Sequence, residues 1–257
     1  MTNLKENLLE LSNLCGVIGL KQSFEDEGVF FEDVVYVKRL TEVCNLLSFV
    51  KIGGCEAKTD IYNCKKLDIN GIIAPMIETP FAMSKFVNCS PEKDRNFIVI
   101  ESKTAYQNID EILLVGENKI SGVVVGRSDL TKSYEMDKKE TDSEFIYSIT
   151  ESVLSKAKQY NLITTLGGNI STKSCEFIKN MFEKKLLDRI ETRNVVIGLN
   201  ENNIQNVETV IKKALDFEIL ILQKKYTESL ACNEDYKKRI DLLDNRKWQD
   251  LKLYQIY

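Results

Sequence analysis

Residues 97–131 contain the feature that most restricts the fold of this chain, which is a pair of apolar runs joined by an amphipathic segment. The first run, FIVI, is followed by Glu101, and the second, GVVVG, is followed three residues later by Asp129. The connecting segment, KTAYQNIDEILL, has the spacing of an amphipathic helix. A strand, a helix and a second strand in this order run parallel in one sheet, so both carboxylates are expected at the same edge. There they could hold one divalent cation between them.

The same alternation of strand and helix patterns continues along most of the chain. Short apolar runs indicate strands at 16–21, 49–52, 71–76, 97–100, 122–125, 162–166 and 195–199. Helical spacing indicates helices at 3–14, 31–46, 55–67, 143–160 and 172–187, and Pro80 suits the first turn of another. We therefore predict an α/β fold with a parallel sheet, namely a (β/α)8 TIM barrel. An eighth strand is not evident, so the barrel is either modified or has its missing strand near the N-terminus.

No linker divides the 257 residues, and all three prolines precede residue 92, so a single TIM-barrel domain over 1–257 is predicted. After the last strand the pattern is wholly helical, with one segment at about 203–229 and another at about 233–253. This predicts a C-terminal helical extension, 203–257. Its apolar stripe would either cover the barrel or contact a neighbouring subunit; the stripe consists of Val207, Ile211, Ala214, Leu215, Ile219 and Leu222.

Charge and cysteine content exclude several classes of protein. The formal net charge of -4, mixed along the chain, argues against a nucleic-acid-binding surface. Seven cysteines without a CxxC pair do not indicate a disulfide framework or a zinc site, and Cys15, Cys44 and Cys64 are expected to be small buried residues. The N-terminus is polar and no apolar run is long enough to span a bilayer. We expect a cytoplasmic protein with no membrane partner.

The chain contains 0 histidines, which is the strongest restriction that composition places on its chemistry. Histidine is the commonest general base in enzymes and the commonest ligand of transition metals. Oxygen ligands therefore remain for any metal site, and these favour a hard cation that keeps several waters.

Three motifs, in order and with regular intervals, carry a resemblance to a known family. They are IAPMIETPFAMSKF, IVIESKTAYQNIDEIL and ISGVVVGRSDLT. Together they resemble the HpcH/HpaI aldolase and citrate lyase β-subunit family, whose members carry strands ending in PM-(IV)-(EQ), in IE-(ST) and in G-x-x-DL. The similarity runs from about residue 49 to about residue 200. The last two motifs also look like those of pyruvate kinase, within the wider superfamily of phosphoenolpyruvate/pyruvate barrels.

The resemblance implies that Glu101 and Asp129 bind Mg²⁺ or Mn²⁺ together with water and an oxo-acid substrate. Such a cation would stabilise the enolate that forms when a carbon–carbon bond breaks. The residues by themselves leave a second interpretation open, in which Glu101 caps the next helix and Asp129 is a helix N-cap.

Three further side chains are candidate catalytic residues. Lys51 stands where similar aldolases carry an arginine that binds the substrate carboxylate, although a lysine lacks the bidentate fork and could simply reach solvent. Arg127 could supply a guanidinium at the same end of the barrel. Glu78 could contact the substrate or metal-bound water, or it could cap the helix that begins at Pro80.

Candidate substrate-binding positions are the glycines that follow strands, where backbone amides can approach an anion closely. They are Gly53, Gly54 and Gly126, with Ser128 beside them. Lys21 would lie at the same end if 16–21 is a barrel strand. The acidic residues 25–27 would lie there too, unless they form a solvated loop.

The resemblance implies a divalent-metal-dependent carbon–carbon lyase or aldolase that acts on a small 2-oxo acid through a pyruvate enolate. One alternative is an acyl-CoA lyase of the citryl or malyl type, which needs a basic groove for the CoA phosphates; the sequence shows no obvious one. Another alternative is a non-catalytic barrel that keeps the metal site. Members of the family often form oligomers through a terminal helix, so a homo-oligomer is expected.

The chain departs from the family in its proton-transfer chemistry. Similar hydroxy-oxo-acid aldolases use a histidine after an early strand to position the water that acts as base, and this chain has none. The candidates that remain are a metal-bound hydroxide, Glu25 or Glu27, or a carboxylate from a neighbouring subunit.

Overall fold

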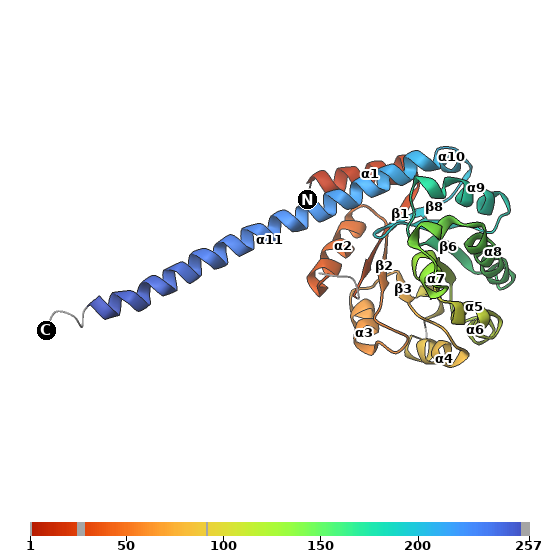
Figure 1. Ribbon diagram of the computed structural model, residues 1–257, viewed down its shortest axis with the longest axis horizontal. Coiled ribbons are helices and arrows are strands. Elements are labelled where there is room, and N and C mark those ends of the chain that lie inside the picture. The colour runs from red at the N-terminus through yellow and green to blue at the C-terminus, as the bar shows by residue number, and fades with distance from the viewer. Residues whose placement is uncertain (1, 25–28, 91, 253–257) are drawn as a thin grey trace. The chain divides into compact units, whose positions relative to one another are not determined.

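The computed structural model describes residues 2–24, 29–90 and 92–252, and in it eight strands close into one barrel in the order β1 to β8 (Figure 1). The α/β barrel predicted from the sequence is therefore confirmed. The strands are β1 (Val17–Ser23), β2 (Leu47–Lys51), β3 (Gly71–Ala74), β4 (Asn96–Ile100), β5 (Gly122–Gly126), β6 (Ile163–Gly167), β7 (Arg189–Glu191) and β8 (Val195–Gly198).

Helices connect most of the strands and surround them on the outside (Figure 1). They are α1 (Thr2–Cys15), α2 (Phe31–Val43), α3 (Lys58–Lys66), α4 (Pro80–Cys89), α5 (Lys103–Gln107), α6 (Ile109–Gly116), α7 (Arg127–Ser133), α8 (Glu144–Gln159), α9 (Cys175–Glu183), α10 (Glu201–Ile204) and α11 (Val207–Lys252). Three short 3₁₀ helices are η1 (Lys93–Arg95), η2 (Lys138–Asp142) and η3 (Thr172–Ser174). As predicted, Pro80 is the first residue of its helix; Thr79 caps that helix by accepting a hydrogen bond from the Ala82 amide at 3.1 Å.

The last two strands correct the prediction of an all-parallel barrel. The run at 195–199 forms the eighth strand, and the missing strand is Arg189–Glu191, far from the N-terminus. A connection of three residues, 192–194, joins β7 to β8, which is too short for a parallel crossover. Strand β8 accordingly runs antiparallel to both β7 and β1, whereas all other neighbouring pairs are parallel.

The interior of the barrel is a packed apolar core with every second residue of a strand pointing into it. Its central cluster comes from five strands and consists of Phe49, Ile73, Phe97, Val99, Val124 and Val196. The rings of Phe49 and Phe97 meet edge to face with centroids 5.9 Å apart. The guanidinium of Arg189 lies over both rings, so Arg189 also points inward. Burial lowers the pKa of this guanidinium, and the nearby Asp188 carboxylate partly offsets that effect.

The buried cysteines agree with their predicted role as small apolar side chains. Cys15, Cys44 and Cys64 are all buried. Burial, with a smaller contribution from the negative charge of Asp60, raises the pKa of the Cys64 thiol to about 12. Thiols of this kind are packing residues rather than nucleophiles.

The chain divides into two compact units, Met1–Leu215 and Asp216–Tyr257. The first contains the barrel and the first turns of α11, and the second contains the remainder of that helix. The two helical segments predicted here are one continuous helix, because no glycine or proline interrupts 207–252. Within the described residues, no helix has both the length and the apolar character needed to cross a membrane.

Candidate active site at the carboxyl end of the barrel

Glu101 is a buried carboxylate directly after β4, with a side chain that is 4% exposed. Its Oε2 lies 3.4 Å from Nζ of Lys51, which ends β2, and its Oε1 accepts a hydrogen bond from the Met76 amide at 2.9 Å. The next helix is capped by Ser102, whose hydroxyl accepts from the Ala105 amide. The interpretation of Glu101 as a helix cap is therefore excluded.

Met76 has a backbone conformation that fits this contact. Its φ is 52°, in the left-handed region that a side chain such as methionine rarely adopts. Its side chain is exposed, while its amide points at the Glu101 carboxylate. A strained residue that aims an amide at a buried carboxylate is typical of a functional site.

A glycine allows Glu101 to pack closely against the neighbouring strand. A Cβ atom at Gly126, which ends the neighbouring strand β5, would lie 2.9 Å from the Glu101 Cβ and 3.0 Å from its Oε2. A side chain at this position would collide with Glu101, so the carboxylate in its present place requires a glycine here. The predicted substrate-binding role of Gly126 stays a prediction, and the structure shows that this glycine allows the Glu101 side chain to pack closely on β5.

Asp129 and Ser128 lie in the first turn of α7, the helix that follows β5. The Asp129 side chain is exposed and Ser128 is half-buried. The N-cap of α7 is Gly126, so Asp129 is the third helical residue and not the cap. Because β4 and β5 are parallel neighbours, Glu101 and Asp129 follow adjacent strands at the same end of the barrel, as the sequence indicates.

The oxygen donors of Glu101 and Asp129 fit a magnesium-type ion, which binds through one or two carboxylates and keeps several waters. Within the described residues, no three or more His, Cys, Asp and Glu side chains gather into a group that could enclose a metal. Any cation here would therefore have water or substrate oxygens for most of its ligands.

Arg127 differs from its predicted role as a guanidinium that reaches substrate. It is 0% exposed, and its guanidinium forms an ion pair with Asp142 while donating hydrogen bonds to the Gly167 and Gly168 carbonyls at 3.2 and 3.0 Å. The group also lies over the Phe177 ring. Burial lowers the pKa of Arg127, and Asp142 partly offsets this. These contacts connect α7, β6 and α9, so we correct the prediction and interpret Arg127 as a structural residue.

Glu78 is half-buried and bound by its neighbours. Its Oε1 accepts a hydrogen bond from the Ser102 hydroxyl at 2.5 Å, and its carbonyl accepts one from the Asn108 side chain at 2.8 Å. It does not cap α4, because Thr79 does. Glu78 therefore supports the segment that follows Glu101, and a contact with substrate stays a prediction.

The glycines after β2 offer less to an anion than predicted. The Gly53 amide donates to Asp60 at 2.8 Å, so it is already engaged, whereas a Cβ at Gly54 would meet no atom within 4 Å. Gly54 alone keeps the open approach that the prediction requires. The acidic residues Glu25, Asp26 and Glu27 lie outside the described residues.

A second ion pair at this end of the barrel has no counterpart in the sequence-based prediction. Nζ of Lys21, on β1, contacts Oε1 of Glu191, the last residue of β7. Their side chains are only 14% and 8% exposed. Glu191 could not be found from the sequence, because its strand has three residues and no apolar run.

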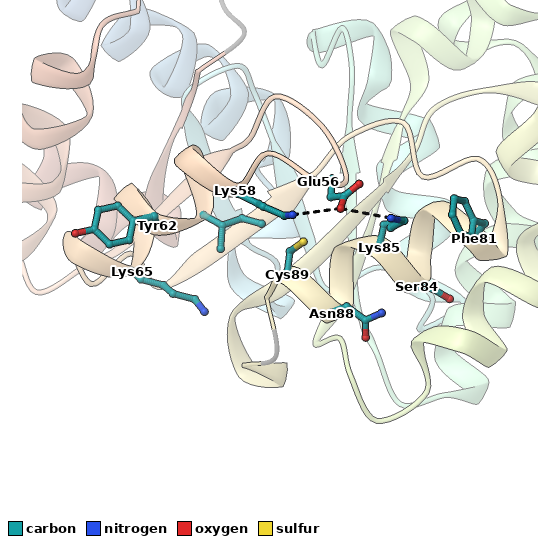
Figure 2. A pocket seen from close by; sticks show the side chains of 10 residues that line it. Glu56, Lys58, Tyr62, Lys65, Phe81, Ser84, Lys85, Asn88 and Cys89 are labelled. Atoms are coloured by element: carbon teal, nitrogen blue, oxygen red, sulfur yellow. Dashed lines mark hydrogen bonds and ion pairs between the residues drawn. The ribbon is translucent and has the colours of Figure 1, made fainter.

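A cavity of about 610 Å³ lies between α3 and α4 (Figure 2). Oε1 of Glu56 lies 3.6 Å from Nζ of Lys58 and 3.5 Å from Nζ of Lys85. Lys65 also lines the cavity, with its Nζ 3.8 Å from Oε1 of Glu92, and the lining is completed by Ile61, Tyr62, Phe81, Ser84, Asn88 and Cys89. Both helices follow strands whose carboxyl ends are at the candidate site, and the lining runs along them from Lys58 and Phe81 in their first turns to Lys65 and Cys89 at their ends. The sequence did not reveal this basic surface because its lysines come from two helices.

Comparison with known proteins gives one family and a set of similar folds. The family described as HpcH/HpaI aldolase/citrate lyase matches residues 45–180. The HpcH/HpaI aldolase from Desulfitobacterium hafniense DCB-2 is 12% identical, with 74% of this chain and 82% of that chain covered and a TM-score of 0.60. A HpcH/HpaI aldolase/citrate lyase family protein from Burkholderia cenocepacia J2315 is 15% identical, with 75% and 83% covered and a TM-score of 0.60.

The citrate synthase SbnG is 14% identical, with 86% of this chain and 89% of that chain covered and a TM-score of 0.59. At these identities the structural likeness shows a shared barrel fold. No curated protein sequence matches the chain.

Proposed function

Because the chain belongs to the HpcH/HpaI aldolase/citrate lyase family, we propose that it is a divalent-metal-dependent carbon–carbon lyase acting on a small 2-oxo acid. The observation that carries this proposal is the buried Glu101 carboxylate, which faces Lys51 at the carboxyl end of the barrel and packs closely against Gly126. Active sites of TIM-barrel enzymes lie at this end.

Glu101 and Asp129 would hold Mg²⁺ or Mn²⁺. When bound, the cation supplies Lewis-acid stabilisation of the enolate oxygen. Lys51 has three N–H donors, and its contact with Glu101 at 3.4 Å leaves others to bind the carboxylate of a 2-oxo acid. Lys51 would therefore orient the substrate as a point charge, without the bidentate geometry of an arginine.

The test is deuterium exchange into the methyl group of pyruvate, followed by NMR, together with direct measurement of Mn²⁺ binding. Glu101→Gln and Asp129→Asn should each lose Mn²⁺ binding and lower the exchange rate by at least about 100-fold, because both lose a metal-binding charge. Glu151→Gln is the matched control, since Glu151 pairs with Lys184 on the outer helices. Its exchange rate should equal that of the wild type.

Exchange that survives both substitutions would contradict the proposal. Mn²⁺ binding without exchange on pyruvate or any other oxo acid would favour the non-catalytic barrel.

The cavity between α3 and α4 favours a second candidate, an acyl-CoA lyase. Lysines 58, 65 and 85 provide positive charge for phosphate groups, and Phe81 and Tyr62 provide exposed aromatic rings for an adenine base. This candidate predicts that the protein binds adenosine 3′,5′-bisphosphate. The variant Lys58→Ala/Lys65→Ala/Lys85→Ala should bind it at least about 10-fold more weakly.

A second groove provides the control for this measurement. It has a volume of about 450 Å³ and includes Lys179 and Lys185 among three acidic side chains, Glu183, Asp188 and Glu201. The variant Lys179→Ala/Lys185→Ala removes two lysines without touching the basic cavity. Equal weakening of binding in both variants would indicate unspecific attraction and remove the acyl-CoA candidate.

We also propose that the protein forms a homo-oligomer through the exposed part of α11. Eight positions follow the alternating spacing of three and four residues that coiled coils require: Ile219, Leu222, Tyr226, Ser229, Asn233, Tyr236, Ile240 and Leu243. All eight are exposed, and six carry large apolar or aromatic side chains. A second copy of the same helix is self-complementary to this seam, and a single Asn in such a seam favours one register.

The proposed compartment is the cytoplasm, where the seven cysteines would stay reduced.

A further inference from the structure

The Lys21–Glu191 pair lies in the same inward-facing layer as the Lys51–Glu101 pair. A Cβ at Gly19 would touch the Phe49 ring of the barrel core, so Lys21, two residues later on β1, also points inward. Arg189 lies over the core rings of Phe49 and Phe97, so Glu191 points inward for the same reason.

Two glycines, on the two strands between β4 and β7, lie between the two carboxylates. Gly126 and Gly167 are partners in the parallel pairing of β5 with β6. A Cβ at Gly126 would lie 3.0 Å from Glu101 Oε2, and a Cβ at Gly167 would lie 3.0 Å from Glu191 Oε1. The layer at the carboxyl end of the barrel therefore presents a carboxylate, two positions without side chains and a second carboxylate, with one lysine on each acid.

The carboxylates of Glu101 and Glu191 differ in the contacts that their oxygens make. Both oxygens of Glu101 have a partner, since Oε1 accepts from the Met76 amide and Oε2 faces Lys51. Lys21 binds Oε1 of Glu191. This contact holds the Glu191 carboxylate through one of its two oxygens.

We infer that Glu191 is the general base of this barrel and that Lys21 is the residue that positions it. The inference rests on the proposed function, because it names the group that moves the proton in the same reaction. It also supplies a general base in a chain without histidine, since a glutamate on the seventh strand takes the place of a base on an early strand.

The step balances with pyruvate alone. Oε2 of Glu191 takes a proton from the methyl carbon, the C–H electron pair forms the C2–C3 double bond, and the carbonyl π electrons move to the C2 oxygen to give the enolate. In D₂O the protonated Glu191 exchanges with solvent and returns a deuteron to C3. No oxidant or reductant is needed.

The first test is Glu191→Gln, which keeps the size and hydrogen-bonding capacity of the side chain but cannot accept the proton. Exchange of pyruvate protons should fall by about 100-fold or more, within the range that a general base contributes. Mn²⁺ binding should stay at the wild-type level, because Glu191 is not among the proposed ligands. This split between binding and exchange distinguishes Glu191 from Glu101.

Further variants distinguish a catalytic role of Glu191 from a purely structural role of the buried Lys21–Glu191 pair. Glu191→Ala removes the carboxylate and leaves space for a small acid, so added formate should restore exchange in a concentration-dependent manner. Lys21→Met should lower exchange by about 10-fold and Lys21→Arg should restore most of it, because arginine keeps the charge that positions the base. A purely structural pair would show neither the formate rescue nor the split between binding and exchange.

Asp188→Asn is the matched control, because Asp188 also pairs with a lysine but precedes β7 instead of ending it. Its exchange rate per folded molecule should equal that of the wild type. A Glu191→Gln variant that exchanges pyruvate at the wild-type rate would overturn the inference while leaving the proposed lyase intact. A wild-type protein that shows no exchange with Mg²⁺ or Mn²⁺ would overturn the proposed function, and the inference with it.

Discussion

Asp188 is a single carboxylate that connects three parts of the barrel wall. Its Oδ2 lies 2.5 Å from Nζ of Lys158 on α8 and accepts a hydrogen bond from the Thr164 amide of β6 at 2.8 Å. Burial alone would raise the pKa of Asp188, but the hydrogen bonds from Lys158 and Thr164 outweigh burial and lower it. The ionised form is therefore more stable in the folded chain than in the unfolded chain.

The lowered pKa of Asp188 predicts that the stability of the fold depends on pH. A carboxyl group whose pKa is lowered by folding stabilises the protein above its unfolded pKa of about 3.9 and loses this effect as the pH falls through the folded value. Asp188→Asn should lower the melting temperature at pH 7, and the difference from wild type should shrink below about pH 4. Thermal unfolding followed by circular dichroism would measure it. A difference that stays constant down to pH 3 would contradict the assignment.

A second prediction at the residue scale concerns Arg127, whose replacement should lower the stability of the fold without changing metal binding. Arg127→Met keeps the apolar stem but leaves Asp142 and the Gly167 and Gly168 carbonyls without their donor. Loss of one partner from a buried pair costs about 3 kcal/mol or more, so urea unfolding should shift to a lower midpoint. Mn²⁺ affinity of the folded fraction should not change. An unchanged unfolding midpoint with lost exchange would return Arg127 to the catalytic residues.

At the scale of elements, the β7–β8 hairpin decides the composition of the candidate site. Its turn brings the chain back at the carboxyl end of the barrel, and the Lys21 amide and the Asn194 carbonyl join β1 to the hairpin at 2.8 Å. A parallel eighth strand would have required a crossover helix and a βα loop at this point. The hairpin instead closes the barrel within a few residues of Glu191.

Helix α11 gives a prediction at the same scale. Leu222→Asp places a charge in the proposed seam and should convert a dimer into a monomer, as measured by light scattering at micromolar concentration. Ala231→Asp introduces the same charge on the same helix at an exposed position outside the seam, so it should leave the dimer intact. A wild-type protein that is monomeric at these concentrations would exclude the coiled coil.

For the whole molecule, the proposed cation should act as a ligand of the folded state. A ligand at about 100 times its dissociation constant stabilises a protein by about 2.7 kcal/mol, which corresponds to a rise of about 5–10 °C for a chain of this size. Mg²⁺ or Mn²⁺ should therefore raise the melting temperature of the wild type and of Glu151→Gln but not of Glu101→Gln. A rise of equal size in Glu101→Gln would show that the cation binds elsewhere.

The amino-acid sequence by itself determined the alternation of strands and helices, the barrel class and the placement of Glu101 and Asp129 after adjacent parallel strands. These properties depend on local apolar periodicity and on the rule that strands joined by helices run parallel, which a single sequence displays. The motifs around Glu101 also predicted the family correctly.

Only the tertiary structure decided which polar side chains face one another. The direction of Arg127 into the barrel wall depends on Asp142 and on two carbonyls forty residues away, and the basic cavity needs lysines from two helices. The Lys21–Glu191 contact joins residues 170 positions apart in the chain, across a strand that was not recognisable as one. Contacts of this kind come from the closure of the barrel, and local pattern carries no information about them.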